Sequence, residues 1–230
     1  MATVLDLLSI LNDKLGPYPD RFVPANSSNN EAVKIRALDA GKEKVWLALV
    51  AASKKGSANW FAQETTANIT SSTRSGALPA DCHDVLGVHL EGVPFRPSAW
   101  HKQNWRDQRE DATVYALADV DEVLWLVHGN DAPVLEIGPK LDTTIAPTIF
   151  YVAKLATWSS SGSSADDVPS PYYDAIVNYA CWSLSTSLQD PAVGSLWWNA
   201  WQSDREMIQA AGSVRQQGGV VSEEDYDSRG

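Results

Sequence analysis

The sequence predicts an α+β fold in which N- and C-terminal helices form a helical bundle with a mostly antiparallel β domain inserted between them. Apolar residues recur at helical spacing near both ends of the 230-residue chain. Between about residues 56 and 158 the period changes to two, the spacing of half-buried strands. We therefore divide the chain into N-terminal helices at 1–55, a β-rich domain at 56–158, a C-terminal helical hairpin at 159–215 and a flexible acidic tail at 216–230.

The composition is that of an ordinary globular protein, with 44% hydrophobic and 20% charged residues. A formal net charge of −11 argues against general nucleic-acid coating and against an anionic membrane surface. No apolar run is long enough to span a bilayer, and no basic stretch precedes the apolar N-terminal residues, so we expect neither a membrane span nor a secretory signal. Ten tryptophans are unusual and favour an assembly, because this residue is enriched at interfaces.

Two helices are predicted in the N-terminal region. The first runs from Thr3 to Leu15 and ends at Gly16, which is followed by a proline. The second runs from about Asn30 to Ser53, after a stretch of Asn and Ser that supplies N-cap candidates. Few charges lie on its outer face, so we expect this helix to be central to the bundle.

Alternating segments bounded by Gly, Pro and Asp predict the strands of the β domain. In the second of them one face should carry Asp84, Leu86, Val88 and Leu90. The predicted strands are 58–66, 83–91, 112–118, 122–128, 133–138 and 147–154.

The C-terminal region returns to the helical period after a Ser- and Gly-rich stretch at 159–170, which we expect to be a flexible link. One helix starts at about Pro171 and a second runs from about Ala192 to Val214, with a break at a Gln-Asp-Pro sequence between them. The tail after them has a Gly-Gly hinge and a cluster of carboxylates, so we expect it to be disordered when free.

Motifs for catalysis, phosphate binding or metal binding are missing from the sequence. The one cluster of suitable residue types is Asp81–Asp84, where Cys82 and His83 should point to opposite faces of a strand. We therefore predict no catalytic site, no metal and no cofactor, and we expect Cys82 and Cys181 to be buried free thiols. The enzyme alternative would use carboxylates within 107–122, which could converge as in glycosidases.

Two aromatic segments are candidate subunit interfaces. Residues 96–109 combine basic side chains with tryptophans, a combination that suits either single-stranded nucleic acid or a protein hot spot. We favour the protein interface because the whole chain is acidic. In the second segment Trp197 and Trp201 share one helix face while Trp198 points about 100° away. The predicted interface residues are Trp100, Trp105, Arg106, Arg109, Trp197, Trp198 and Trp201.

The order of these features resembles the head-to-tail adaptor (connector, head-completion) proteins of tailed bacteriophages. The resemblance covers about 30–215 and rests on a Leu-Pro-x-Asp entry at Leu78–Asp81, a Pro-Thr-Ile-Phe-Tyr-Val strand at 147–152 and the closing helical hairpin. Its most specific part is the Pro-Tyr-Tyr-Asp-Ala-Ile-Val-Asn-Tyr-Ala stretch that begins at Pro171.

The resemblance implies a structural virion protein with no enzymatic activity. Such adaptors form a ring, typically of twelve copies, in the virion neck beneath the portal, and they assemble in the host cytoplasm. Their partners are the portal protein, tail or neck proteins, and double-stranded DNA that passes through the channel without sequence-specific binding. The C-terminal segment reaches the portal in this family, so the expected portal-binding residues are Val220, Val221, Glu223, Glu224, Asp225 and Tyr226.

Three alternatives remain open at this point. The chain could be another tail or neck completion protein of a phage, a single-stranded nucleic-acid-binding protein that uses residues 96–109, or a hydrolytic enzyme. Steep salt dependence of oligonucleotide affinity would favour the second, and two convergent acids with a perturbed pKa in a deep pocket would favour the third.

Overall fold

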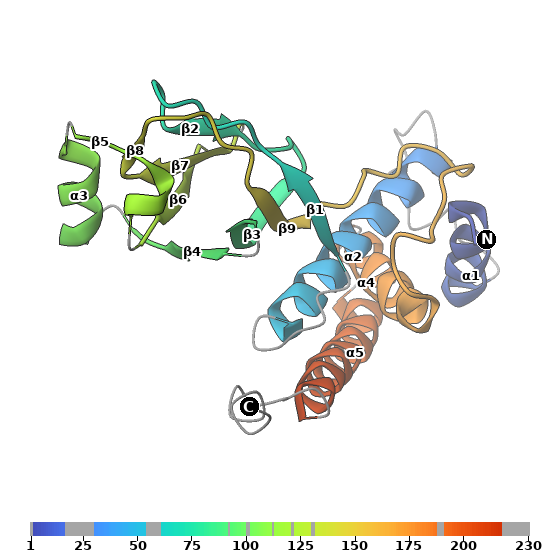
Figure 1. Ribbon diagram of the computed structural model, residues 1–230. Helices are drawn as coiled ribbons and strands as arrows, with labels where there is room; N and C mark the ends of the chain where they lie inside the picture. Colours follow the sequence, from blue (N-terminus) through green and yellow to red (C-terminus); the bar gives the residue numbers. More distant parts are fainter. Residues whose placement is uncertain are drawn as a thin grey trace, which may run out of the picture. The chain divides into compact units, whose positions relative to one another are not determined.

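The computed structural model describes residues 2–16, 30–53, 61–91, 93–99, 102–111, 113–120, 122–129, 132–187 and 191–217. The fold is α+β, as predicted, with five α-helices and a large, mostly antiparallel sheet in this part of the chain (Figure 1). The chain divides into two compact units: a helical unit of Met1–Asn59 with Leu155–Gly230, and a β unit of Trp60–Lys154. None of the described helices is long and apolar enough to cross a membrane.

The helical unit begins with α1 (Val4–Leu15), whose apolar positions are buried at helical spacing. The Thr3 backbone N–H donates to the Asp6 carboxylate at 2.7 Å, and this bond lowers the pKa of Asp6. Helix α2 (Asn30–Ser53) contacts the C-terminal helices α4 (Tyr173–Ser187) and α5 (Pro191–Gln217). Gly41 permits a close approach to α4, because a Cβ there would lie 2.5 Å from the Ile176 carbonyl oxygen.

The stretch at 159–170, which we expected to be a flexible link, is packed on α1. The backbone N–H groups of Val4 and Leu5 donate to the carbonyls of Ser163 and Ser161, each at 2.9 Å. These N–H groups lie in the first turn of a helix and have no partner within it, so the loop satisfies them. The prediction of flexibility was wrong because a Ser- and Gly-rich composition does not reveal such backbone partners.

A second contact fixes the start of the same loop on α2. Trp158 is buried beneath Lys42, whose ammonium lies 4.6 Å from the ring centroid. Lys42 also pairs with Asp39 at 2.7 Å and donates to the Ala156 carbonyl. Asp39 in turn accepts the Trp158 backbone N–H at 2.8 Å, so this buried lysine has its charge and its donors satisfied.

The main sheet of the β unit has the strand order β1-β9-β3-β4-β6-β7-β2. All neighbours in it are antiparallel except β4 and β6, which pair in parallel over two residues. The strands are β1 (Ala62–Thr66), β2 (Ser75–Ala77), β3 (Cys82–Leu90), β4 (Val93–Pro97), β6 (Leu124–His128), β7 (Val134–Gly138) and β9 (Thr148–Ala153).

The remaining elements of the β unit are short. Strands β5 (Val114–Tyr115) and β8 (Lys140–Leu141) form a separate parallel pair, and α3 (Gln103–Glu110) precedes β5. The predicted strand at 112–118 was wrong in its second half, where the 3-10 helix η2 (Leu117–Asp119) forms. Helix α3 and the strands β2, β4 and β8 were not predicted from the sequence.

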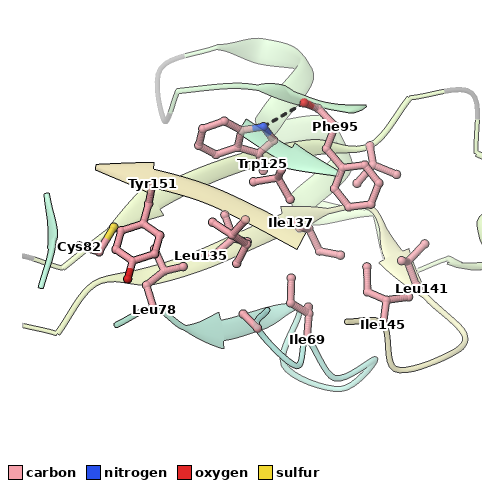
Figure 2. Packing of buried hydrophobic residues seen from close by; sticks show 14 of the residues in the cluster. Ile69, Leu78, Cys82, Phe95, Trp125, Leu135, Ile137, Leu141, Ile145 and Tyr151 are labelled. Atoms are coloured by element: carbon pink, nitrogen blue, oxygen red, sulfur yellow. Dashed lines mark hydrogen bonds between the residues drawn. The ribbon is translucent and has the colours of Figure 1, made fainter. Parts of the chain in front are cut away.

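The core of the β unit lies between the sheet and its connecting loops (Figure 2). Trp125 is its largest member, and its indole N–H donates to the Phe95 carbonyl at 3.0 Å, which satisfies the one polar atom of a buried ring. All members of this cluster come from the β unit, and those labelled in Figure 2 are Ile69, Leu78, Cys82, Phe95, Trp125, Leu135, Ile137, Leu141, Ile145 and Tyr151.

Candidate interaction surfaces

An aromatic cluster joins α4 to α5 in the helical unit. The rings of Trp182 and Trp198 lie 4.6 Å apart between centroids, and Tyr179 lies 5.1 Å from Trp182. Trp198 remains 37% exposed and Leu196 is 63% exposed. We call Tyr179, Trp182 and Trp198 the tryptophan patch. Aromatic rings that pack on one another at a surface are large and rigid, which suits them to anchor a protein contact.

The structure separates the three predicted tryptophans of α5. Trp201 is 4% exposed and packs edge-on against Tyr179 at 5.4 Å, so it is a core residue of the helical unit and not a surface anchor. Trp197 is half-buried, and Trp198 is the one that takes part in the patch. Tyr179 and Trp182 were not predicted as surface aromatic residues, although a spacing of three residues on one helix indicates that they share a face.

The other predicted interface segment is also divided by burial. Trp105 is 0% exposed and packs with Leu124 and Leu126, so in the single chain it presents no surface to a partner. Arg106 and Arg109 stay at the surface on α3, and Trp100 lies outside the described residues. Helix α3 buries one tryptophan and carries polar residues on its other faces. The mixture of Trp and basic residues in the sequence therefore corresponds to a short amphipathic helix.

A basic pocket of about 420 Å³ opens beside α3. It is lined by Arg74, Trp105, Arg106, Arg109 and Glu110, and we call it the arginine pocket. The Arg74 guanidinium donates to the carbonyls of Gln108 at 3.2 Å and Arg109 at 2.8 Å, at the C-terminal end of α3, where unpaired carbonyls attract a cation. Arg109 Nε lies 3.2 Å from Glu136 Oε1. Arg74 was missed because it precedes α3 by about thirty residues in the sequence.

Three residues of the Asp81–Asp84 cluster, Cys82, His83 and Asp84, line a larger cavity of about 750 Å³ in the β unit. Cys82 is buried and His83 is exposed, as their alternation predicts. Burial, followed by the charges of Asp81 and Asp84, raises the pKa of Cys82, which is the opposite of what a nucleophilic thiol needs. No group of metal-binding side chains forms among the residues that the structure describes.

The carboxylates that an enzyme would use are spread over local surface contacts. Asp111 accepts bonds from the Tyr115 hydroxyl at 2.7 Å and the Thr113 N–H at 2.8 Å, and these bonds lower its pKa to about 2. A general acid requires a raised pKa instead. Asp107 accepts from Gln103, and Glu122 pairs with Arg96 at 2.9 Å.

The six predicted portal-binding residues at 220–226 lie outside the described residues. The described chain ends with α5 at Gln217, so the segment that carries them follows directly from the helix of the tryptophan patch.

A known protein family matches most of the chain. The family model described as "SU10 adaptor protein" matches residues 4–222, which include both the tryptophan patch and the arginine pocket. No curated protein matches the chain. The resemblance to phage head-to-tail adaptors is confirmed by this match, and the family is one of structural proteins. The chain therefore belongs to the SU10 adaptor protein family, and it is a structural protein of a bacteriophage.

Proposed function

We propose that this protein forms a closed ring in the neck of the virion, beneath the portal, and joins the capsid to the tail. The observation that carries the proposal is the family match over residues 4–222. The resemblance suggests about twelve copies in the ring, with portal protein on one side and tail or neck proteins on the other. A net charge of −11 supports a channel lining that repels DNA phosphates and so lets the duplex slide.

The tryptophan patch is the best-supported lateral contact of the proposed ring. A closed ring needs two different surfaces on each subunit that fit each other. Trp198 supplies an exposed aromatic surface on α5, whereas the exposed Leu196, two residues before it, points to another side of the helix. Arg106 and Arg109 supply a polar surface in the β unit, where Arg is a preferred interface residue.

The C-terminal tail is the proposed portal-binding segment. Val220, Val221 and Tyr226 would fill pockets while Glu223, Glu224 and Asp225 pair with basic groups of the portal. Ordering each residue costs about 1–2 kcal/mol of backbone entropy, so one tail binds weakly. Many tails on one ring would recover the affinity through effective concentration.

We also propose that helices α1, α2, α4 and α5 form one bundle with the β unit as an inserted domain. The contacts of α2 with α4 and α5, and of α1 with α4, support this arrangement. The two parts of the helical unit flank the β unit in the sequence, which is the order expected of an insertion.

Native mass spectrometry and negative-stain imaging of the full chain, with and without portal, test the ring. We expect rings, or rings that form on the portal. A protein that stays monomeric in both conditions contradicts the proposal. For the tail, deletion of residues 216–230 should leave the folded chain intact and abolish docking to portal-containing heads, whereas unchanged occupancy would exclude the tail from docking.

A further inference from the structure

The arginine pocket concentrates positive charge in an acidic protein. Arg74, Arg106 and Arg109 bring three guanidinium groups to it from two places in the chain, and Glu110 also lines it. Glu136 pairs with Arg109, and its other oxygen lies 3.4 Å from His128 Nε2. Among the lining residues, three arginines against Glu110 leave a formal charge of 3 − 1 = +2, while Glu136 pairs with Arg109 and Asp111 interacts with Arg74 beside them.

The arginines keep binding capacity although they already make contacts. A guanidinium carries five N–H donors in a planar fork that matches a carboxylate. Arg74 directs Nη1 and Nη2 to carbonyls of α3, which holds its charge at the pocket. The Arg109 side chain is half exposed, and Arg106 lies at the surface. The geometry therefore suits a carboxylate that enters from solvent.

The pocket fits an acidic peptide better than a nucleic acid. A duplex presents one negative charge about every 1.7 Å and requires an extended row of cations. Asp107 and Glu110 interrupt such a row on α3 itself. A discrete pocket of about 420 Å³ accommodates one or two acidic side chains.

The chain itself contains a matching ligand. Glu223, Glu224, Asp225 and Asp227 place four carboxylates within five positions, the densest acidic run in the sequence. The run lies beyond the region that the family model matches, which ends at residue 222. Five residues separate it from the end of α5 at Gln217, so the run can reach about 20 Å from the helix when extended.

From this complementarity we infer that the arginine pocket is a binding site for an acidic peptide, and that the peptide is residues 223–227 of a second copy of this chain. The contact adds a specific polar link between copies to the proposed ring. The binding step itself does not depend on a portal or on ring closure. If the tail also docks on a portal, as proposed above, the two acceptors compete for the same residues.

A labelled peptide of residues 216–230, titrated with the full chain and followed by fluorescence anisotropy, tests the inference. We expect saturable binding that weakens as salt is raised, because the contact is between partly exposed charges. The double variant Arg106→Gln/Arg109→Gln should bind about tenfold or more weakly, since it loses charge-assisted hydrogen bonds. The control Arg36→Gln/Arg205→Gln removes the same charge from exposed arginines of the helical unit and should keep its affinity.

Two further measurements keep the test decisive if the double variant folds poorly. Arg106→Gln alone leaves the Arg109–Glu136 pair in place and should still weaken binding. A peptide with Gln at 223 and 224 and Asn at 225 and 227 should lose binding to the unchanged protein. Equal affinity of the neutral peptide, equal loss in the control variant, or tighter Arg106-dependent binding of a DNA oligonucleotide would each overturn the inference.

Discussion

Trp198 and Trp201 are three residues apart on α5 and have opposite environments. Trp201 is enclosed by the helical unit against Tyr179, whereas Trp198 lies over Trp182 with one side open to solvent. A buried tryptophan stabilises the folded chain, while an exposed one has its apolar surface available for a partner. The two residues therefore contribute to different properties of the protein.

Replacing each tryptophan by alanine should separate these properties. Trp201→Ala creates a cavity in the helical unit and should lower the free energy of unfolding by about 3–5 kcal/mol, measured by chemical denaturation. Trp198→Ala should cost much less stability and should weaken self-association, measured by analytical ultracentrifugation. Leu86→Ala, at an exposed apolar residue of the β unit, is the control for association. Equal loss of association in Leu86→Ala and Trp198→Ala would refute a specific role for the patch.

Cys181 is fully buried in α4, and burial raises the pKa of its thiol to about 12. Above about pH 9 the unfolded chain loses this proton while the folded chain keeps it, so stability should fall as pH rises towards 12. Cys181→Ala should remove this contribution and show a shallower loss of stability over the same pH range. Parallel curves for the two proteins would contradict the assignment.

At the scale of elements, the positions and types of the helices near both ends follow from apolar periodicity and stop signals. The β unit was harder to predict because β3 contains two register shifts, between Cys82 and Asp84 and between Val85 and Gly87. A bulge reverses the side to which later residues point. Val85 consequently packs on the core and Leu86 is exposed, so the face predicted from strict alternation was wrong.

The interaction surfaces were predictable only in part for a related reason. Periodicity shows which residues share a helix face, but it does not show which face is buried, and Trp105 and Trp201 are both on buried faces. Arg106 and Arg109 stood out as basic residues near tryptophans. Arg74 reaches the same pocket through tertiary structure, for which the local sequence has no signal.

Alanine substitutions at two helical glycines should change stability in opposite directions. Gly41→Ala should destabilise the helical unit by more than 1 kcal/mol, because the added methyl group would meet the Ile176 carbonyl oxygen of α4. A Cβ added at Gly194 in α5 would make only ordinary van der Waals contacts, so Gly194→Ala should stabilise the helical unit by about 0.5–1 kcal/mol through helix propensity. Thermal and chemical denaturation of both variants measure the difference. Stabilisation by Gly41→Ala would show that α2 and α4 are farther apart.

At the scale of the whole molecule, the β unit has what an independent folding unit needs. Its hydrophobic cluster contains only its own residues, and its first and last strands are neighbours, with Ala62 paired to Val152. Chain ends that lie close together are typical of a domain that tolerates insertion or excision.

Residues 60–154 expressed alone should therefore fold. We expect a strand-rich circular dichroism spectrum and a cooperative thermal transition. The complementary chain, with Asn59 joined to Leu155 through a short Gly-Ser linker, should give a helical spectrum. A fragment 60–154 without a cooperative transition would mean that the β unit needs the helices to fold.

The pairing of β1 with β9 also determines how the connection between the two units responds to tension. Both polypeptide connections leave the sheet at the same end of this pair, near Ala62 and Val152. A pull on the two connections loads one residue pair at a time, since the strands peel apart instead of sliding past each other. Strand β1 lies at the sheet edge, so its five residues can detach and provide about 17 Å of slack while the core strands stay paired. Detachment of the edge strand would therefore lengthen the connection between the two units, and renewed pairing of β1 with β9 would shorten it again.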